Sequence, residues 1–139
     1  MLHLKTLSKS FNSPEGTLEV LNGIDFSISK GESLAIIGES GSGKSTLLHI
    51  IAGLEKPSEG LVEFQGNDLW SLPEHRRAKV RRERMAVIFQ QFNLIPCLSV
   101  KDNIEFHAKI IGKFDPEFAL NAIKLLKLED ILSKYPEQI

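Results

Sequence analysis

The stretch Gly38-Glu39-Ser40-Gly41-Ser42-Gly43-Lys44-Ser45 constrains this chain more than any other, because it fits the phosphate-binding pattern G-x-x-x-x-G-K-[ST]. Glycines at its first, fourth and sixth positions let successive backbone N–H groups point inward around an anion. The Lys44 ammonium can reach the β- and γ-phosphates of a nucleotide, and the Ser45 hydroxyl can ligate Mg²⁺. A helix that opens at Ser45 adds the positive end of its dipole. The motif therefore predicts a site for a nucleoside triphosphate.

The segments on either side of the loop support this interpretation. Ser33 to Ile37 is a short apolar run, which is typical of a buried parallel strand. Residues 47–51 are mostly apolar and predict a helix, which Gly53 ends at the position after the cap. A glycine-rich turn that binds nothing is the alternative, and the strand-loop-helix context makes it the weaker one.

Composition limits the size of the fold and the classes of partner. A chain of 139 residues, 42% of them hydrophobic, can form one modest α/β domain. Its 17 basic and 18 acidic residues leave a formal charge of −1, so overall charge gives no reason to expect nucleic-acid binding. Cys97 is the single cysteine, which excludes an internal disulfide and a cysteine metal cage. No stretch approaches the ~18 apolar residues of a membrane-spanning helix.

Four further segments predict strands. Residues 2–7 and 18–28 have alternating or nearly alternating apolar positions and predict two strands of an antiparallel sheet, joined by a turn at residues 12–16. Leu61 to Phe64 predicts a short strand. Met85 to Phe89 is apolar and bounded by polar residues, and so predicts a second buried core strand.

A helix is predicted from Ser71-Leu72-Pro73-Glu74, which has the form of a capping box with proline in the first turn. It carries seven basic residues: His75, Arg76, Arg77, Lys79, Arg81, Arg82 and Arg84. A solvated helix face is the commoner meaning of such a run, while contact with nucleic acid or anionic lipid headgroups is the alternative.

Two more helices are predicted in the last third of the chain. Ser99 and Asp102 resemble a capping box before a helix that ends at Gly112. Asp115-Pro116 starts another helix, whose buried stripe is expected to include Ile123 and Leu126. A last short turn is expected within residues 129–134.

Gln90 stands at the carboxyl end of the expected strand 85–89. Ligands of parallel α/β sheets bind beyond the carboxyl ends of strands, where the glycine-rich loop also lies. A glutamine there can orient a water or ligate Mg²⁺ through its carbonyl without repelling an anion. On its own, an ordinary polar residue at a strand end is an equally good interpretation.

Taken together, these motifs resemble the nucleotide-binding subunit of an ABC transporter. The resemblance rests on residues 38–48, on their spacing to Phe89-Gln90-Gln91-Phe92-Asn93-Leu94-Ile95-Pro96, and on residues 98–104. The glycine-rich motif is shared with kinases and small GTPases. The stretch from Phe89 to Pro96 is more specific, because it resembles the Q-loop of ABC ATPases, particularly those of the lipoprotein-release and macrolide-export branch.

The resemblance implies a role for each matching position. ATP and Mg²⁺ are the implied ligands, and Phe11 falls where the family stacks an aromatic ring on adenine. Lys44 and Gln90 are the implied catalytic residues, and Ser45 and Gln90 the implied ligands of the metal. The implied contacts of the triphosphate are Gly38, Glu39, Ser40, Gly41, Ser42, Gly43, Lys44, Ser45 and Thr46.

The resemblance also implies partners and a place in the cell. Residues Phe92 to Leu98 would contact a transmembrane permease subunit, and a second ATP-binding subunit would complete a dimer. Such a subunit lies peripherally on the cytoplasmic face of the inner membrane and needs no nucleic acid.

The sequence departs from the family in what it lacks. The signature motif, the acidic Walker B run and the switch histidine of the family have no match within residues 1–139, which therefore correspond to the N-terminal part of such a domain. We expect no ATP hydrolysis by this chain alone, because the water-positioning groups are missing. The alternatives are a non-catalytic, ATP-responsive module that docks on a membrane subunit and, less well supported, a small-molecule kinase.

Overall fold

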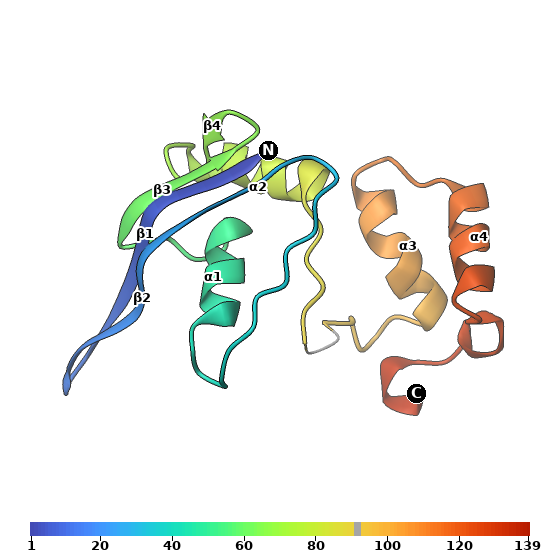
Figure 1. Ribbon diagram of the computed structural model, residues 1–139. Coiled ribbons are helices and arrows are strands. Elements are labelled where there is room, and N and C mark those ends of the chain that lie inside the picture. Colours follow the sequence, from blue (N-terminus) through green and yellow to red (C-terminus); the bar gives the residue numbers. More distant parts are fainter. Residues whose placement is uncertain (91–92) are drawn as a thin grey trace. The chain divides into compact units, whose positions relative to one another are not determined.

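The computed structural model describes residues 1–90 and 93–139, which divide into two compact units, Met1–Val87 and Ile88–Ile139. The first unit combines a small sheet with two helices (Figure 1). Its elements are β1 (Leu2–Ser13), β2 (Gly16–Ile28), α1 (Lys44–Ile51), β3 (Glu59–Phe64), β4 (Asn67–Asp68) and α2 (Glu74–Arg84).

The sheet is antiparallel, with the strand order β2-β1-β3-β4. Strand β1 pairs on both edges, and its first residue, Leu2, lies opposite Ile28 of β2 and Phe64 of β3. Three irregularities interrupt the pairing of β1 with β2, and each bends the strands locally. The antiparallel strands expected from the alternating sequence pattern are confirmed.

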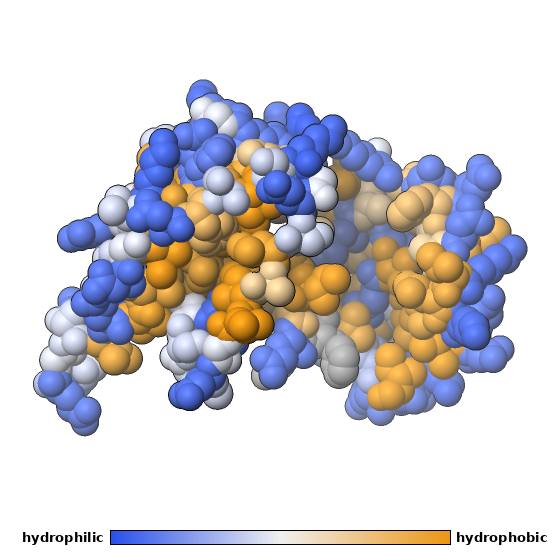
Figure 2. All heavy atoms as spheres, in the orientation of Figure 1, coloured by the Kyte–Doolittle hydropathy of each residue, from blue (hydrophilic) through white to orange (hydrophobic). Residues whose placement is uncertain are grey.

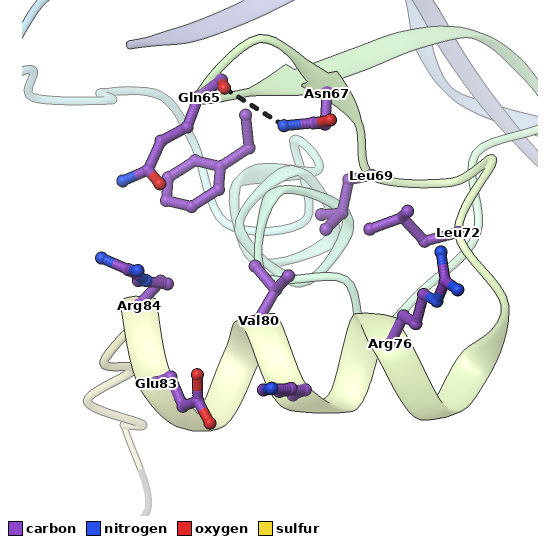
Figure 3. Close-up of a pocket in the computed structure, with 10 residues that line it drawn as sticks. Gln65, Asn67, Leu69, Leu72, Arg76, Val80, Glu83 and Arg84 are labelled. Atoms are coloured by element: carbon purple, nitrogen blue, oxygen red, sulfur yellow. Dashed lines mark hydrogen bonds between the residues drawn. The ribbon is translucent and has the colours of Figure 1, made fainter.

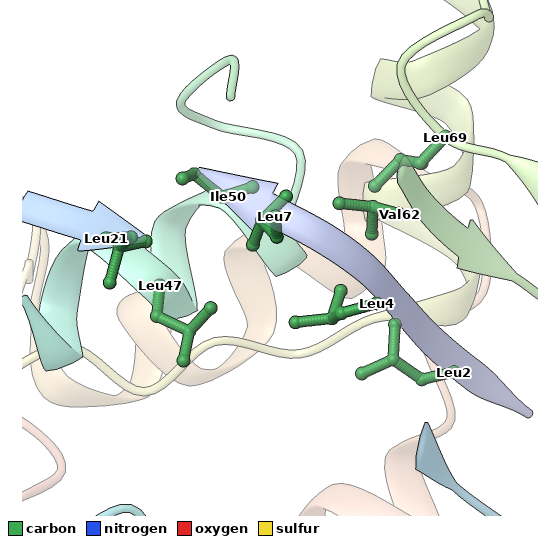
Figure 4. Close-up of a cluster of buried hydrophobic side chains, with 8 residues drawn as sticks. All are labelled: Leu2, Leu4, Leu7, Leu21, Leu47, Ile50, Val62 and Leu69. Atoms are coloured by element: carbon green, nitrogen blue, oxygen red, sulfur yellow. The ribbon is translucent and has the colours of Figure 1, made fainter. Parts of the chain in front are cut away.

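The core of the first unit lies between this sheet and α1. Leu47 and Ile50 of α1 pack with side chains from the strands, and Ile50 is fully buried. Full burial of one such side chain contributes about 1.5–3 kcal/mol. Figure 4 shows the complete cluster: Leu2, Leu4, Leu7, Leu21, Leu47, Ile50, Val62 and Leu69.

The prediction of parallel strands at residues 33–37 and 85–89 is wrong, since neither segment forms a strand in the described part of the structure. Ile37 is 91% exposed and Ile88 is 98% exposed, although both were expected in a core. A buried strand needs neighbours on its edges and faces, and an apolar sequence does not supply them. Figure 2 shows the result as apolar side chains, in orange, on the visible surface of both units.

Helix α2 is present, but the expected capping box at Ser71 is wrong. Pro73 is the N-cap, and no side chain caps the helix. The Ser71 hydroxyl donates instead to the carbonyl of Asp68, at 2.8 Å. The short link before the helix also places Trp70, whose indole Nε1–H donates to the carbonyl of Ile50 in α1, at 3.3 Å.

The second unit contains α3 (Val100–Ile110), α4 (Pro116–Leu125) and two short 3-10 turns, η1 (Glu129–Ile131) and η2 (Pro136–Gln138). Both sequence-predicted caps are confirmed. The Ser99 side chain accepts from the Asp102 N–H, and Asp115 accepts from the N–H groups of Glu117 and Phe118. The predicted stripe of α4 is only partly right, because Ile123 is buried whereas Leu126 is 65% exposed.

Membrane-spanning potential can be judged from the helices. Within residues 1–90 and 93–139, no helix has both the length and the apolar character needed to cross a bilayer.

Candidate functional site

The glycine-rich loop of the first unit turns sharply into α1. Gly38, Gly41 and Gly43 have φ values of 155°, 81° and 85°, which L side chains rarely adopt. Helix α1 begins at Lys44, one residue earlier than the sequence indicated, and the Leu47 N–H donates to the Gly43 carbonyl at 2.8 Å. The glycine spacing of the motif therefore corresponds to the backbone shape of the loop.

Two of these glycines also lie where a side chain would collide. A Cβ on Gly43 would lie 2.9 Å from both Cγ1 and the carbonyl oxygen of Val20. Val20 is the extra residue of β2 at the irregularity between the Lys9–Leu21 and Ser10–Glu19 pairs, so the loop lies against a bulge of the sheet. A Cβ on Gly38 would lie 2.8 Å from Oγ of Ser42. The loop thus has no room for a side chain at Gly43, where backbone stands in the way, whereas a Cβ at Gly38 would require only the Ser42 side chain to rotate.

The backbone of the loop offers hydrogen-bond donors. Among the described residues, no protein acceptor is paired with the N–H groups of Gly41, Gly43, Lys44 and Ser45. The first N–H groups of a helix have no intrahelical partner and carry partial positive charge. Several such donors around one glycine-rich turn suit the oxygens of a phosphate.

Lys44 turns its side chain back over the loop. Its Nζ donates to the carbonyls of Gly38 at 2.9 Å and Glu39 at 2.6 Å, and to Oγ of Ser42 at 3.3 Å. These partners are neutral, and no carboxylate of the described chain forms an ion pair with this ammonium. The positive charge of Lys44 is therefore held at the loop and is free to attract an anion.

The remaining loop residues differ in exposure. Glu39, Ser40 and Ser45 are exposed, whereas Thr46 is half-buried in the first turn of α1. The Ser45 hydroxyl is thus accessible at the helix start, where a hard cation bound to phosphate could use its oxygen. The structure brings all of the predicted loop residues together.

Phe11 lies on β1 in the same unit and is 40% exposed. Nζ of Lys9 lies 4.6 Å from the centre of its ring, a cation–π contact that sequence reasoning missed. Lys9 itself is buried and donates to Oε1 of Glu55 at 2.5 Å and to the Lys56 carbonyl at 2.8 Å. Because an aromatic ring has two faces, a cation over one leaves the other for stacking.

Gln90 and the predicted partner segment belong to the second unit. Gln90 is exposed at a bend, so its role beside a nucleotide stays a prediction. Gln91 and Phe92 lie outside the described residues, so only 93–98 of the expected contact segment can be described. Asn103 fixes that part, since its Nδ2 donates to the carbonyls of Ile95, Leu98 and Ser99 at 3.0–3.1 Å. Leu94 at its start is partly exposed.

Comparisons with known proteins agree on one family. The profile described as "ABC transporter" matches residues 21–138. A lipoprotein-releasing system ATP-binding protein, LolD, of Shewanella frigidimarina is 39% identical over 127 residues, covering 91% of this chain and 53% of that protein. A macrolide export ATP-binding/permease protein, MacB, of Shigella flexneri is 39% identical over 142 residues, covering 100% of this chain and 22% of that protein.

A solved structure is also similar. The ATP-binding cassette MJ0796, in a dimeric post-hydrolysis state bound to ADP and Pi, matches with a TM-score of 0.89 and 35% identity, over 100% of this chain and 63% of that one. The chain therefore has the α/β fold of such a cassette, and it corresponds to 63% of the MJ0796 chain. This chain spans about half the length of the LolD relative, and less of the MacB relative.

Proposed function

Since this chain belongs to the ABC transporter family, we propose that it is the nucleotide-contacting part of an ATP-binding subunit that couples ATP binding and hydrolysis to transport. The observation that carries the proposal is the loop at residues 38–45. Within the described chain, several of its backbone N–H groups are free, its close approach to the sheet requires glycine at position 43, and the charge of Lys44 is not neutralised by a carboxylate. The ATP-binding names of the relatives and the ADP and Pi of the MJ0796 cassette support ATP as the ligand.

Lys44 is proposed to act as an exchangeable cation. Its ammonium is now satisfied by two backbone carbonyls and one hydroxyl, which are neutral acceptors. Phosphate oxygens carry charge and form stronger hydrogen bonds with an ammonium than neutral carbonyls do. We therefore expect Lys44 to leave the Gly38 and Glu39 carbonyls when a triphosphate binds.

The metal ligands and the aromatic platform are proposals as well. Ser45 and Gln90 would hold Mg²⁺, which supplies charge neutralisation for the phosphates when bound. Gln90 would additionally respond to the γ-phosphate. Phe11, held by Lys9 on one ring face, would stack on adenine with the other.

The partners and the location follow from the same family. We propose that the segment 92–98 contacts a transmembrane permease subunit and that a second ATP-binding subunit pairs with the complete protein. The dimeric state of the MJ0796 cassette and the fused permease of the MacB relative support these proposals. The location would be the cytoplasmic face of the inner membrane.

Titration calorimetry of the chain with Mg-ATP tests the proposal. Lys44→Ala removes the uncompensated cation, and we expect it to weaken binding at least about tenfold, because a charge-assisted contact contributes about 1.4 kcal/mol or more. Lys30→Ala is the matched control, since Lys30 is exposed in the loop before residues 33–37 and should leave the affinity unchanged. Equal affinities for Lys44→Ala and the unaltered chain would contradict the assignment of the loop.

A further inference from the structure

A cavity in the first unit has no part in the proposed nucleotide site. It lies between the β3–β4 hairpin and α2 and has a volume of about 380 Å³ (Figure 3). Small-molecule sites typically occupy about 300–1,000 Å³, so its size is appropriate for a small organic ligand. It shares no residue with the loop at 38–45. The lining residues are Phe64, Gln65, Asn67, Leu69, Leu72, Arg76, Lys79, Val80, Glu83 and Arg84.

The basic residues of α2 fall into two groups with different surroundings. Arg77 and Arg81 both form ion pairs with Glu74. In addition, Arg77 donates to the Leu72 carbonyl at 3.0 Å, and Arg81 donates to the Gly53 carbonyl at 2.8 Å. Arg77 also lies 4.3 Å over the ring of Trp70. These two arginines therefore attach the helix to the rest of the unit.

The second group lines the cavity. Arg76, Lys79 and Arg84 lie on one face of α2 and, within the described part of the chain, form no ion pair. Glu83 is the one carboxylate among the lining residues, and its Oε1 lies 3.9 Å from Nη2 of Arg82. Three cations beside one carboxylate leave the cavity positive, which favours an anion.

The other wall has different chemistry. Figure 3 shows Leu69 and Leu72 across the cavity from Val80 of α2. Phe64 is a further apolar lining residue, and these side chains form the apolar surface of the cavity. Gln65 and Asn67 stand at the hairpin, where Asn67 Nδ2 donates to the Gln65 carbonyl at 3.2 Å. Among the described residues, the side-chain amide of Gln65 has no hydrogen-bond partner, although its backbone N–H donates to the Met1 carbonyl at 2.8 Å. A ligand here would thus meet cations, an amide and apolar carbon together.

Gln65 has an unusual backbone for its residue type. Its φ of 52° and the 81° of Gly66 give the two-residue hairpin turn that Asn and Gly normally form. A non-glycine residue in this region is strained, and such strain is concentrated at functional sites. In Figure 3 the Gln65 side chain extends from the turn toward the α2 side of the cavity, which both Gln65 and Arg84 line.

We propose that this cavity binds a small organic phosphate, with the phosphate at Arg76, Lys79 and Arg84 and an apolar group on the half-buried side chains of Phe64, Leu72 and Val80. Guanidinium groups match the geometry of phosphate oxygens. A phosphate group has enough charged oxygens to bond with two arginines and a lysine at once, whereas a ligand carboxylate has only two oxygens. Either a soluble phosphate ester or the headgroup region of a phospholipid has the required chemistry.

The test uses the 139-residue chain carrying Lys44→Ala, so that the glycine-rich loop does not compete for phosphate. NMR titrations with phenyl phosphate, inorganic phosphate and dihexanoylphosphatidic acid follow the side-chain amide signals of Gln65 and Asn67. We expect phenyl phosphate to bind at least about fivefold more tightly than inorganic phosphate, because only the ester covers the apolar surface of the cavity. Tighter binding of the lipid than of phenyl phosphate would identify the phospholipid source, and the reverse order the soluble ester. Equal affinity of inorganic phosphate and both esters overturns the proposal.

Matched substitutions on one helix separate the cavity from general charge. Arg76→Gln and Arg84→Gln should each weaken phenyl phosphate binding about fivefold, whereas Arg82→Gln, outside the cavity, should change it less than twofold. Far-UV circular dichroism checks that each variant keeps its helices. An equal loss in all three variants would mean attraction to a basic surface, and the cavity site would be rejected. Every measurement is made on the Lys44→Ala chain. A negative result for the cavity would therefore not affect the proposal that the glycine-rich loop binds ATP.

Discussion

Replacing Gly43 by alanine tests how the glycine-rich loop lies on the sheet, and Gly41→Ala is a control from the same loop. Both glycines have φ near +80°, so alanine at either position is strained by about 1 kcal/mol. They differ in surroundings. Nothing lies within 4 Å of a Cβ at Gly41, whereas a Cβ at Gly43 would be 2.9 Å from the Val20 carbonyl oxygen.

The additional cost at Gly43 comes from this overlap. The Val20 oxygen belongs to the backbone of β2, so relief requires a shift of the strand or of the loop. Overpacking of this kind costs about 1–3 kcal/mol. We therefore expect Gly41→Ala to lower the free energy of unfolding of the first unit by about 1 kcal/mol, and Gly43→Ala to lower it by about 3 kcal/mol.

Fluorescence of Trp70, the single tryptophan, measures the effect in urea. Its indole is hydrogen-bonded to the Ile50 carbonyl, so the signal follows the attachment of α1, which the loop precedes. Calorimetry with Mg-ATP gives a second measurement, in which Gly43→Ala should lose more affinity because a displaced loop moves the N–H groups of Lys44 and Ser45. Equal destabilisation by both substitutions would show that the loop does not lie against Val20, and the reasoning from contacts would be refuted.

Three other changes have expected outcomes in the same unit. Ile50→Ala empties a fully buried position and should cost about 3 kcal/mol of unfolding free energy in urea, while Leu48→Ala, at a 52% exposed position, should cost less than about 1 kcal/mol. Gln65→Asn suits the left-handed turn better and should raise the urea midpoint, with a gain of about 0.5 kcal/mol. The hydrogen bond from Arg81, together with the charge of Arg77, holds the pKa of Glu74 below its ordinary value of 4.5. The ionised Glu74 carboxylate therefore stabilises α2 above pH 4.5, and this stabilisation is lost as the pH falls through the lowered pKa. Circular dichroism should show this loss as an acid-dependent decrease in the helix signal, which Glu74→Gln should abolish.

Local sequence signals predicted the elements that depend on local contacts. The caps at Ser99 and Asp115 formed as expected because each side chain bonds to N–H groups two or three residues away. The shape of the glycine-rich loop was predictable for the same reason, since its glycines and Lys44 lie within eight residues of one another. At Ser71 the same pattern failed, because the hydroxyl found a different neighbour, the Asp68 carbonyl.

Features that need distant segments were not predictable. The run 33–37 has the composition of a core strand, but strand formation requires a hydrogen-bonding neighbour that composition does not specify. The contact between Lys9 and Phe11 depends on Glu55, which lies 46 residues from Lys9 in the sequence. The cavity beside α2 likewise requires the β3–β4 hairpin and the helix to meet. The basic run in the sequence indicated a positively charged helix. It did not indicate that Arg77 and Arg81 attach the helix to the unit whereas Arg76 and Arg84 line the cavity.

The exposed run Ser33 to Ile37 has a consequence for how this polypeptide behaves at high concentration. It has five uncharged residues, no proline, and Leu34 and Ile37 facing solvent. Such a segment is a template onto which an identical segment from another molecule can add, forming intermolecular cross-β structure. A charged gatekeeper such as Ala35→Lys should delay this self-association, whereas crowding molecules together should hasten it.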